Sequence, residues 1–184
     1  FPGAGRYSAR GPAVSVIWRT SNDHLVVDER DYKRFLRFPT GRALEGALAE
    51  NAAWAREWFA AYAHPWSTAI LADPSVCALA SSHFPEDSNL AVVAVSAGPE
   101  AEAEAAARWQ ADEPDRYFFL ECYAAAVVEA LLAAARCRLG AERHLCPGYR
   151  GWPIADNHVL LAVFHSADAL AGPLAVLSSG MLVP

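Results

Sequence analysis

One carboxylate stands alone in the most apolar stretch of the chain. Thirteen of the fourteen residues from Cys122 to Ala135 are apolar, and Glu129 is the only charged one. Burying an unpaired carboxylate costs several kcal/mol or forces it to take up a proton, so we expect Glu129 to face a cleft, a basic side chain or a cationic group of a ligand. A solvated or arginine-paired glutamate on an alanine-rich helix is the alternative, and the residues alone leave both open.

A loop that follows this stretch is the second candidate for chemistry. The ten residues from His144 to Pro153 include two prolines, two glycines, two large aromatic side chains and two ionisable groups. Glycine lets a ligand approach the main chain, proline fixes φ, and the rings of Tyr149 and Trp152 offer flat surfaces for a purine or a sulfonium cation. The loop is therefore a candidate ligand site. A tight turn packed on the core by its aromatic side chains is the alternative.

Other kinds of chemistry are disfavoured at this loop. His144 and Cys146 with His158 and His165 match no recurrent zinc pattern, so no metal site is predicted. A Cys146 nucleophile activated by His144 is also disfavoured, because side chains two residues apart in a proline-bounded turn need not meet. The sequence contains no phosphate-cradling loop and no GxSxG motif. No catalytic residue is assigned.

Both candidates depend on the elements around them. A long helix is predicted over residues 115–139, with Asp115 as its N-terminal cap and Gly140 where a left-handed residue is favoured. The loop 141–153 follows, and a short helix is expected at about 154–164. Glu129 should therefore lie on the helix that immediately precedes the candidate loop.

The remaining segments mix helices and strands. Trp54, Trp58 and Phe59 are assigned to the core. Two helices are expected, at about 43–62 and 99–111. The expected extended segments are a hairpin from residues 14–18 and 24–27, two strands or one bent strand in 66–71 and 76–80, a strand at 90–95 and an extended run at 174–183. There is no regular βαβ repeat and no GxGxxG motif after a strand, which favours an α+β fold over a Rossmann sheet.

The composition restricts the class of protein. A chain of 184 residues with 54% apolar side chains can bury on the order of 70% of the surface that its unfolded form exposes, so a single domain is expected. Acidic residues outnumber basic ones by 21 to 15. This balance argues against binding to nucleic acid or to an anionic membrane, because both need clustered positive charge.

The cysteines and the apolar pattern bear on location. Cys77, Cys122, Cys137 and Cys146 lack CxxC spacing, which suggests neither a zinc cluster nor a disulfide framework and fits a reducing cytoplasm. No run of about 18 uncharged apolar residues and no signal-peptide pattern is found, so we expect a soluble cytoplasmic protein. The chain starts without Met, and both ends are compatible with a longer chain.

Residues 147–153 also resemble a motif of a known family. Pro-Gly-Tyr at 147–149 followed by Trp-Pro at 152–153 is similar to the PGYxxWP variant found in relatives of the activation domain of cobalamin-dependent methionine synthase. Three further stretches resemble that family and fall in its order, namely Ala91 to Glu100, Ala124 to Leu131 and Leu177 to Pro184. Together the matches span roughly residues 90–184, about half of the chain.

The resemblance implies a fold and a site. The fold would be α+β, a single domain with a twisted, mainly antiparallel sheet and long flanking helices over residues 31–184, preceded by an arm with a hairpin at 1–30. Glu129 takes the place of the glutamate that holds the amino group of the methionine moiety. The other residues of the implied S-adenosylmethionine site are Arg143, His144, Cys146, Pro147, Gly148, Tyr149 and Trp152. His144 occupies the position of the family's arginine, whose forked guanidinium binds the carboxylate of the ligand. Arg143 beside it is therefore the candidate to bind this carboxylate.

Three functions are compatible with these residues. By resemblance, the domain binds S-adenosylmethionine and presents its methyl group to a reduced corrinoid. It would then need a partner protein that carries cobalamin, an electron donor, or both. Loss of the forked arginine favours a second hypothesis, a stand-alone biosynthetic enzyme that uses the same pocket for another small molecule. The third is a non-catalytic interaction module, whose apolar excess would serve a partner interface. Assembly into a homo-oligomer is left open.

Overall fold

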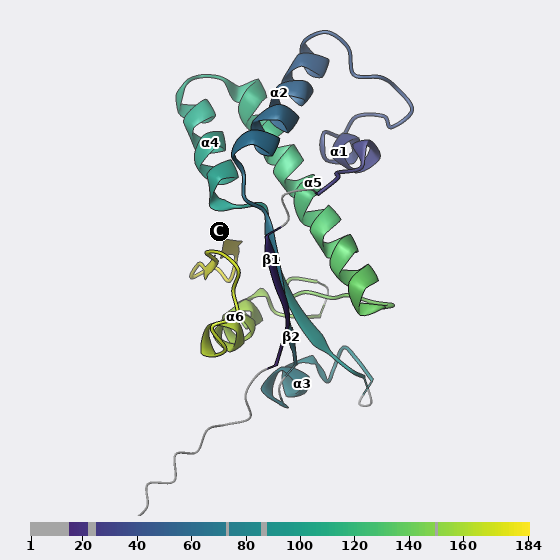
Figure 1. Ribbon diagram of the computed structural model, residues 1–184, viewed down its shortest axis with the longest axis vertical. Helices are drawn as coiled ribbons and strands as arrows, with labels where there is room; N and C mark the ends of the chain where they lie inside the picture. The colour runs from purple at the N-terminus through teal and green to yellow at the C-terminus, as the bar shows by residue number, and fades with distance from the viewer. Residues whose placement is uncertain (1–14, 22–24, 73, 86–87, 150) are drawn as a thin grey trace, which may run out of the picture.

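A three-stranded antiparallel sheet lies at the centre of the computed structural model, which describes residues 15–21, 25–72, 74–85, 88–149 and 151–184 (Figure 1). The strands β1 (Val16–Ser21), β2 (Trp66–Leu71) and β3 (Ala91–Ser96) lie in the order β1-β2-β3. The first five residues of β2 are all buried. Because successive side chains of a strand point to opposite faces, both faces of the sheet must be covered.

The helix α5 (Pro114–Leu139) covers one face. Ala135 of this helix packs with Trp18 of β1 and Ala69 of β2. The helix ends at Gly140, whose φ of 62° and ψ of 29° are the left-handed conformation that glycine adopts at low cost. The predicted helix and its glycine C-terminus are thus confirmed.

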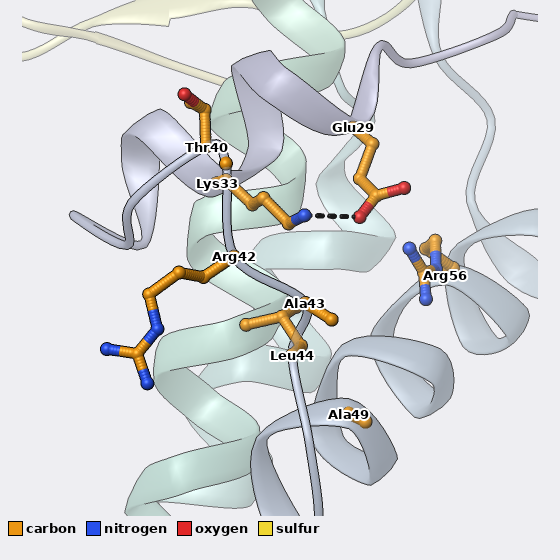
Figure 2. Close-up of a pocket in the computed structure, with 9 residues that line it drawn as sticks. Glu29, Lys33, Thr40, Arg42, Ala43, Leu44, Ala49 and Arg56 are labelled. Atoms are coloured by element: carbon orange, nitrogen blue, oxygen red, sulfur yellow. Dashed lines mark ion pairs between the residues drawn. The ribbon is translucent and has the colours of Figure 1, made fainter.

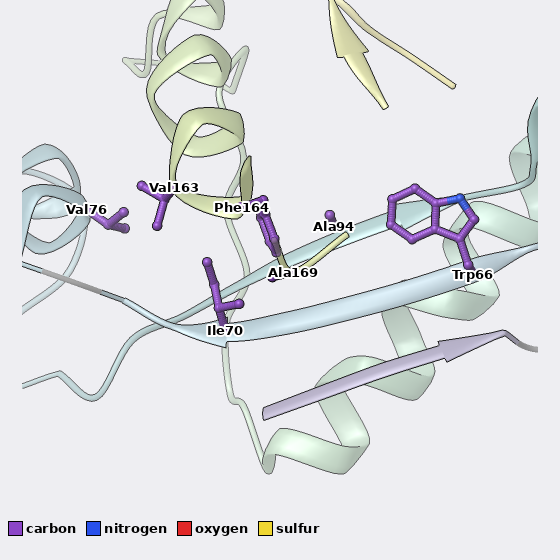
Figure 3. Packing of buried hydrophobic residues seen from close by; sticks show 7 residues of the cluster. All are labelled: Trp66, Ile70, Val76, Ala94, Val163, Phe164 and Ala169. Carbon is purple, nitrogen blue, oxygen red and sulfur yellow. The ribbon is translucent and has the colours of Figure 1, made fainter. Parts of the chain in front are cut away.

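The opposite face is covered by α3 (Pro74–Ala80), α6 (Asn157–Ser166) and the segment after α6 (Figure 3). The buried residues of this cluster are Trp66, Ile70, Val76, Ala94, Val163, Phe164 and Ala169. Polar contacts tie the segment after α6 to the sheet. The Arg19 Nε donates to the Ala169 carbonyl at 3.0 Å, and the Ala171 N–H donates to the Thr68 hydroxyl at 3.1 Å.

The N-terminal half of α5 is enclosed by α1 (Glu29–Phe35), α2 (Ala47–Tyr62) and α4 (Pro99–Gln110). Tyr32 of α1 is 1% exposed, and its hydroxyl donates to the Phe119 carbonyl at 3.0 Å. Ala101 and Ala105 of α4 pack on α5 with Phe59 of α2. Small residues at these contacts allow the helices to approach closely, and α5 forms the common axis of the helical layer.

The C-terminal segment carries a 3-10 turn, η1 (Ile154–Asp156), and a second, two-stranded antiparallel sheet of β4 (Ala175–Val176) and β5 (Leu182–Val183). The Asn157 amide donates to the Gly180 carbonyl at 2.9 Å. This hydrogen bond fixes the turn between β4 and β5 to the start of α6.

Most of the predicted elements are confirmed. The described residues form an α+β arrangement with small antiparallel sheets, as the sequence indicates. β2, β3, α2, α4, α5 and the short helix after the loop lie within a few residues of their predicted bounds. The extended run at 174–183 contains β4 and β5.

Three local predictions are wrong. Residues 76–80 belong to α3 rather than a strand, because Pro74 suits a first helical position and so short an apolar run fits either structure. The predicted hairpin between residues 14–18 and 24–27 is not found, because β1 pairs with β2 and the described residues 25–28 form no strand. Residues 1–14 and 22–24 lie outside the described part of the chain. Helix α5 begins at Pro114 with Glu113 at the cap position, two residues before the predicted cap Asp115.

By length and composition alone, α5 could cross a membrane, and 39% of its most apolar part is buried within the protein. This is weak evidence, because the core helix of a soluble protein has the same character. Here the helix packs against α1, α2, α4 and the sheet.

Candidate functional site

Glu129 lies on an exposed face of α5, between the buried residues Val127 and Leu131. Its carboxylate acts electrostatically on two residues of the loop. Partial burial raises the pKa of the Cys146 thiol, a hydrogen bond with Tyr149 lowers it, and the Glu129 charge raises it. The pKa of the Tyr149 phenol is raised by Cys146, by the hydrogen bond between the two side chains, by partial burial and by Glu129. Glu129 therefore lies within electrostatic range of Cys146 and Tyr149.

The loop that carries Cys146 and Tyr149 is held by its own backbone. The Tyr149 N–H donates to the Cys146 carbonyl at 3.1 Å, the Trp152 N–H to the Tyr149 carbonyl at 2.9 Å, and the Gly148 N–H to the Trp152 carbonyl at 2.9 Å. Gly148 has a φ of +97° and Gly151 a φ of +88°, which other residues adopt only with strain. Two consecutive turns thus fix the direction of the Tyr149 side chain.

Tyr149 is 47% exposed and has a histidine beside it. The centroids of the His144 and Tyr149 rings are 6.3 Å apart, with an interplanar angle of 59°. The exposed residues Glu129, His144, Cys146 and Tyr149 form a surface cluster, which we call the Glu129 cluster. It combines a carboxylate, an imidazole, a thiol and a phenol, groups that can bind a cation and exchange hydrogen bonds.

Trp152 has a different role from its neighbours in the loop. It is 7% exposed, its indole N–H donates to an Asp156 carboxylate oxygen at 2.9 Å, and its ring stacks on His83 with centroids 4.8 Å apart. Pro147 is buried as well. These two residues anchor the loop, as in the alternative of a turn packed on the core by its aromatic residues.

Arg143 points toward the same anchoring region. Its guanidinium carbon lies 5.7 Å from the centroid of the Phe84 ring. Phe84 and Cys77 line a small cavity of about 150 Å³ beside α3. The structure thus brings Glu129, His144, Cys146, Gly148 and Tyr149 together, and it places Arg143 and Trp152 against residues 83–84.

A larger cavity lies among α1, the segment 40–44 and α2 and was not predicted. It measures about 340 Å³, and α2 contributes Ala49 and Arg56 to its lining (Figure 2). Its charged lining residues are Glu29, Lys33, Arg42 and Arg56. No local motif could have identified it, because these residues are spread over three segments and α1 itself was not expected. None of the residues of the Glu129 cluster lines this cavity.

The described residues thus define an α+β protein with a surface cluster of polar and ionisable groups beside its longest helix. No group of three His, Cys, Asp or Glu side chains in the described ranges is arranged to hold a metal ion. No protein-family model matches the chain, and no curated protein matches it significantly. The resemblance to the activation domain of methionine synthase therefore rests on the motif residues alone.

Proposed function

We propose that the protein binds S-adenosylmethionine at the Glu129 cluster and positions it for the reductive methylation of a corrinoid carried by a partner protein. The main support is that the Glu129 carboxylate lies within electrostatic range of Cys146 and of the exposed Tyr149. S-adenosylmethionine carries two cationic groups, an ammonium and a sulfonium. A carboxylate and an aromatic face are the groups that bind such cations.

The roles of the residues follow from their chemistry. Glu129 accepts hydrogen bonds from the ammonium group, and the Tyr149 ring faces the sulfonium. Gly148 lacks a side chain that would keep a ligand from the backbone of the loop, and Trp152 holds the loop through Asp156. The methyl donor supplies the reactive carbon, and the protein contributes its orientation.

The carboxylate end of the ligand has a weaker partner. Arg143 lies over Phe84, and His144 is the cationic candidate beside Tyr149. An imidazole grips a carboxylate by charge only while it is protonated, unlike a guanidinium. We therefore expect His144→Arg to strengthen binding at neutral pH.

Calorimetric titration with S-adenosylmethionine tests the site. Glu129→Gln should weaken binding by about tenfold, because a charge-assisted contact becomes a neutral one. Glu121→Gln, an exposed glutamate on the same helix, is the matched control and should bind as the native protein does. Absence of binding at millimolar S-adenosylmethionine would contradict the proposal. Equal affinities of Glu129→Gln and Glu121→Gln would show that the ligand binds outside the Glu129 cluster.

A second candidate is a stand-alone enzyme that uses the same cluster for another small molecule. The contact of Arg143 with Phe84 favours it, since the guanidinium is then engaged away from the cluster. Spectra of a cobalamin under reducing conditions, with S-adenosylmethionine and with or without the protein, separate the two. A corrinoid methylated no faster with the protein would favour this second function.

A further inference from the structure

Cationic side chains outnumber acidic ones around the cavity between α1 and α2, which we call the α1–α2 cavity. Lys33, Arg42 and Arg56 line it with a single carboxylate, that of Glu29. The lining therefore carries two more positive than negative charges, in a protein whose net charge is −6. A local excess of this sign selects anionic ligands.

The carboxylate is already engaged by one of the cations. The Lys33 ammonium lies 2.7 Å from a Glu29 oxygen, and its side chain is only 9% exposed. The hydrogen bond and the charge of Lys33 hold the pKa of Glu29 below its usual range, and Arg56 acts in the same direction. Glu29 thus stays ionised and compensates the buried ammonium.

The two arginines keep donors for a ligand: the guanidinium carbon of Arg42 lies 6.0 Å from the centroid of the Phe38 ring, and such a contact leaves the planar N–H donors free. Within the described ranges, no ion pair links Arg42 or Arg56 to a carboxylate. Figure 2 shows Lys33 and Arg56 on either side of the Glu29 carboxylate, whereas Arg42 extends away from it at the rim. A guanidinium presents a planar fork of donors that matches phosphate oxygens.

The backbone at the cavity also suits an anion. Ala49, in the first turn of α2, lines the cavity, and no side chain caps this 16-residue helix at Gly46. The unpaired N–H groups of a first helical turn favour negative charge. A Cβ added at Gly41 would meet nothing within 4 Å, so the segment 40–44 leaves open space there.

We propose that the α1–α2 cavity binds a small organic phosphate, with its phosphate group held by Arg56 beside Lys33 and with Arg42 adding positive charge at the rim. A volume of about 340 Å³ lies at the lower end of small-molecule sites, about 300–1,000 Å³, and exceeds the needs of a free phosphate ion. Leu44, Ala43 and Ala49 supply apolar contact for the organic part. This site shares no lining residue with the Glu129 cluster, so the proposal can be tested independently of the proposed binding of S-adenosylmethionine.

Titration of the native protein with ribose 5-phosphate, inorganic phosphate and ribose tests the ligand class. We expect ribose 5-phosphate to bind most tightly, inorganic phosphate more weakly and ribose not at all, and we expect binding to weaken as salt is added. Equal affinity for the two phosphates would overturn the organic part of the proposal. No binding of either at millimolar concentration would overturn the site.

Variants test the position of the site. Arg56→Gln and Arg42→Gln should each weaken ribose 5-phosphate on the order of tenfold, while Glu29→Gln should tighten it severalfold because it removes the competing negative charge. Arg34→Gln is the matched control, since Arg34 is an exposed arginine of α1 that pairs with Asp31 outside the cavity. A thermal melt of each variant verifies folding. Equal affinities of Arg56→Gln and Arg34→Gln, or no gain for Glu29→Gln, would contradict the proposal.

Discussion

At the scale of single residues, Cys146 reports on the geometry of the Glu129 cluster. Its side chain is exposed, so reagents can reach it, and its pKa is raised by partial burial and by the Glu129 charge while Tyr149 lowers it. The thiolate is the reactive form of a cysteine. The rate at which Cys146 is alkylated therefore measures how its two neighbours act on it.

Substitutions of these neighbours should change this rate in opposite directions. Glu129→Gln removes a negative charge, which lowers the pKa of Cys146 and should speed its alkylation by iodoacetamide roughly threefold at pH 8. Tyr149→Phe removes the hydrogen bond that stabilises the thiolate and should slow it. Mass spectrometry of the peptide containing Cys146 gives the rates, and the exposed Cys137 is the internal control. A rate unchanged in Glu129→Gln would mean that the carboxylate does not reach the loop.

At the scale of elements, α5 determines both the core and the site. Leu131 is 1% exposed and packs with α2 and α4, whereas the next residue, Leu132, is only partly buried. Glu129 is exposed on the same turn. A rotation of the helix by about 100°, the angle between successive residues, would therefore exchange buried and exposed positions and carry Glu129 away from the loop.

Alanine substitutions at the two leucines test this orientation. Leu131→Ala leaves a cavity in a packed core and should lower the free energy of unfolding by about 2–5 kcal/mol, and Leu132→Ala by clearly less. Urea denaturation followed by circular dichroism measures both. Equal losses would show that the helix is oriented differently.

The elements differ in how well the sequence predicts them. α5 and its end at Gly140 follow from a long apolar run and a left-handed glycine, and β2 and β3 from apolar runs between turn residues. Local patterns failed for α3, where tertiary context decided between helix and strand. They also failed for α1, whose seven residues are mostly charged and whose burial depends on Tyr32.

Candidate site residues show the same division. The composition of the loop and the isolation of Glu129 indicated a site, but whether they act together depends on the path that residues 140–149 take after α5, which no local pattern determines. The anchoring of Trp152 by His83 and Asp156 involves a residue almost seventy positions away. The α1–α2 cavity likewise arises from packing of three separate segments.

At the scale of the whole molecule, the two candidate sites differ in charge and place. The Glu129 cluster presents a carboxylate and an aromatic ring on the surface, suited to a cation, and the α1–α2 cavity presents arginines, suited to an anion. Helix α5 connects them, because α1 packs on its N-terminal half and its later residue Glu129 lies within electrostatic range of the loop. Occupancy of one site should therefore be tested with the other site intact.

Protection of Cys146 by S-adenosylmethionine tests the central proposal most directly, because it reports the ligand and its location together. The alkylation rates of Cys146 and Cys137 are measured in the native protein at increasing ligand concentration. We predict that the rate at Cys146 falls in proportion to occupancy while the rate at Cys137 stays constant, and that Glu129→Gln needs about tenfold more ligand for the same protection. Unchanged alkylation of Cys146 at saturating S-adenosylmethionine would contradict the proposed site.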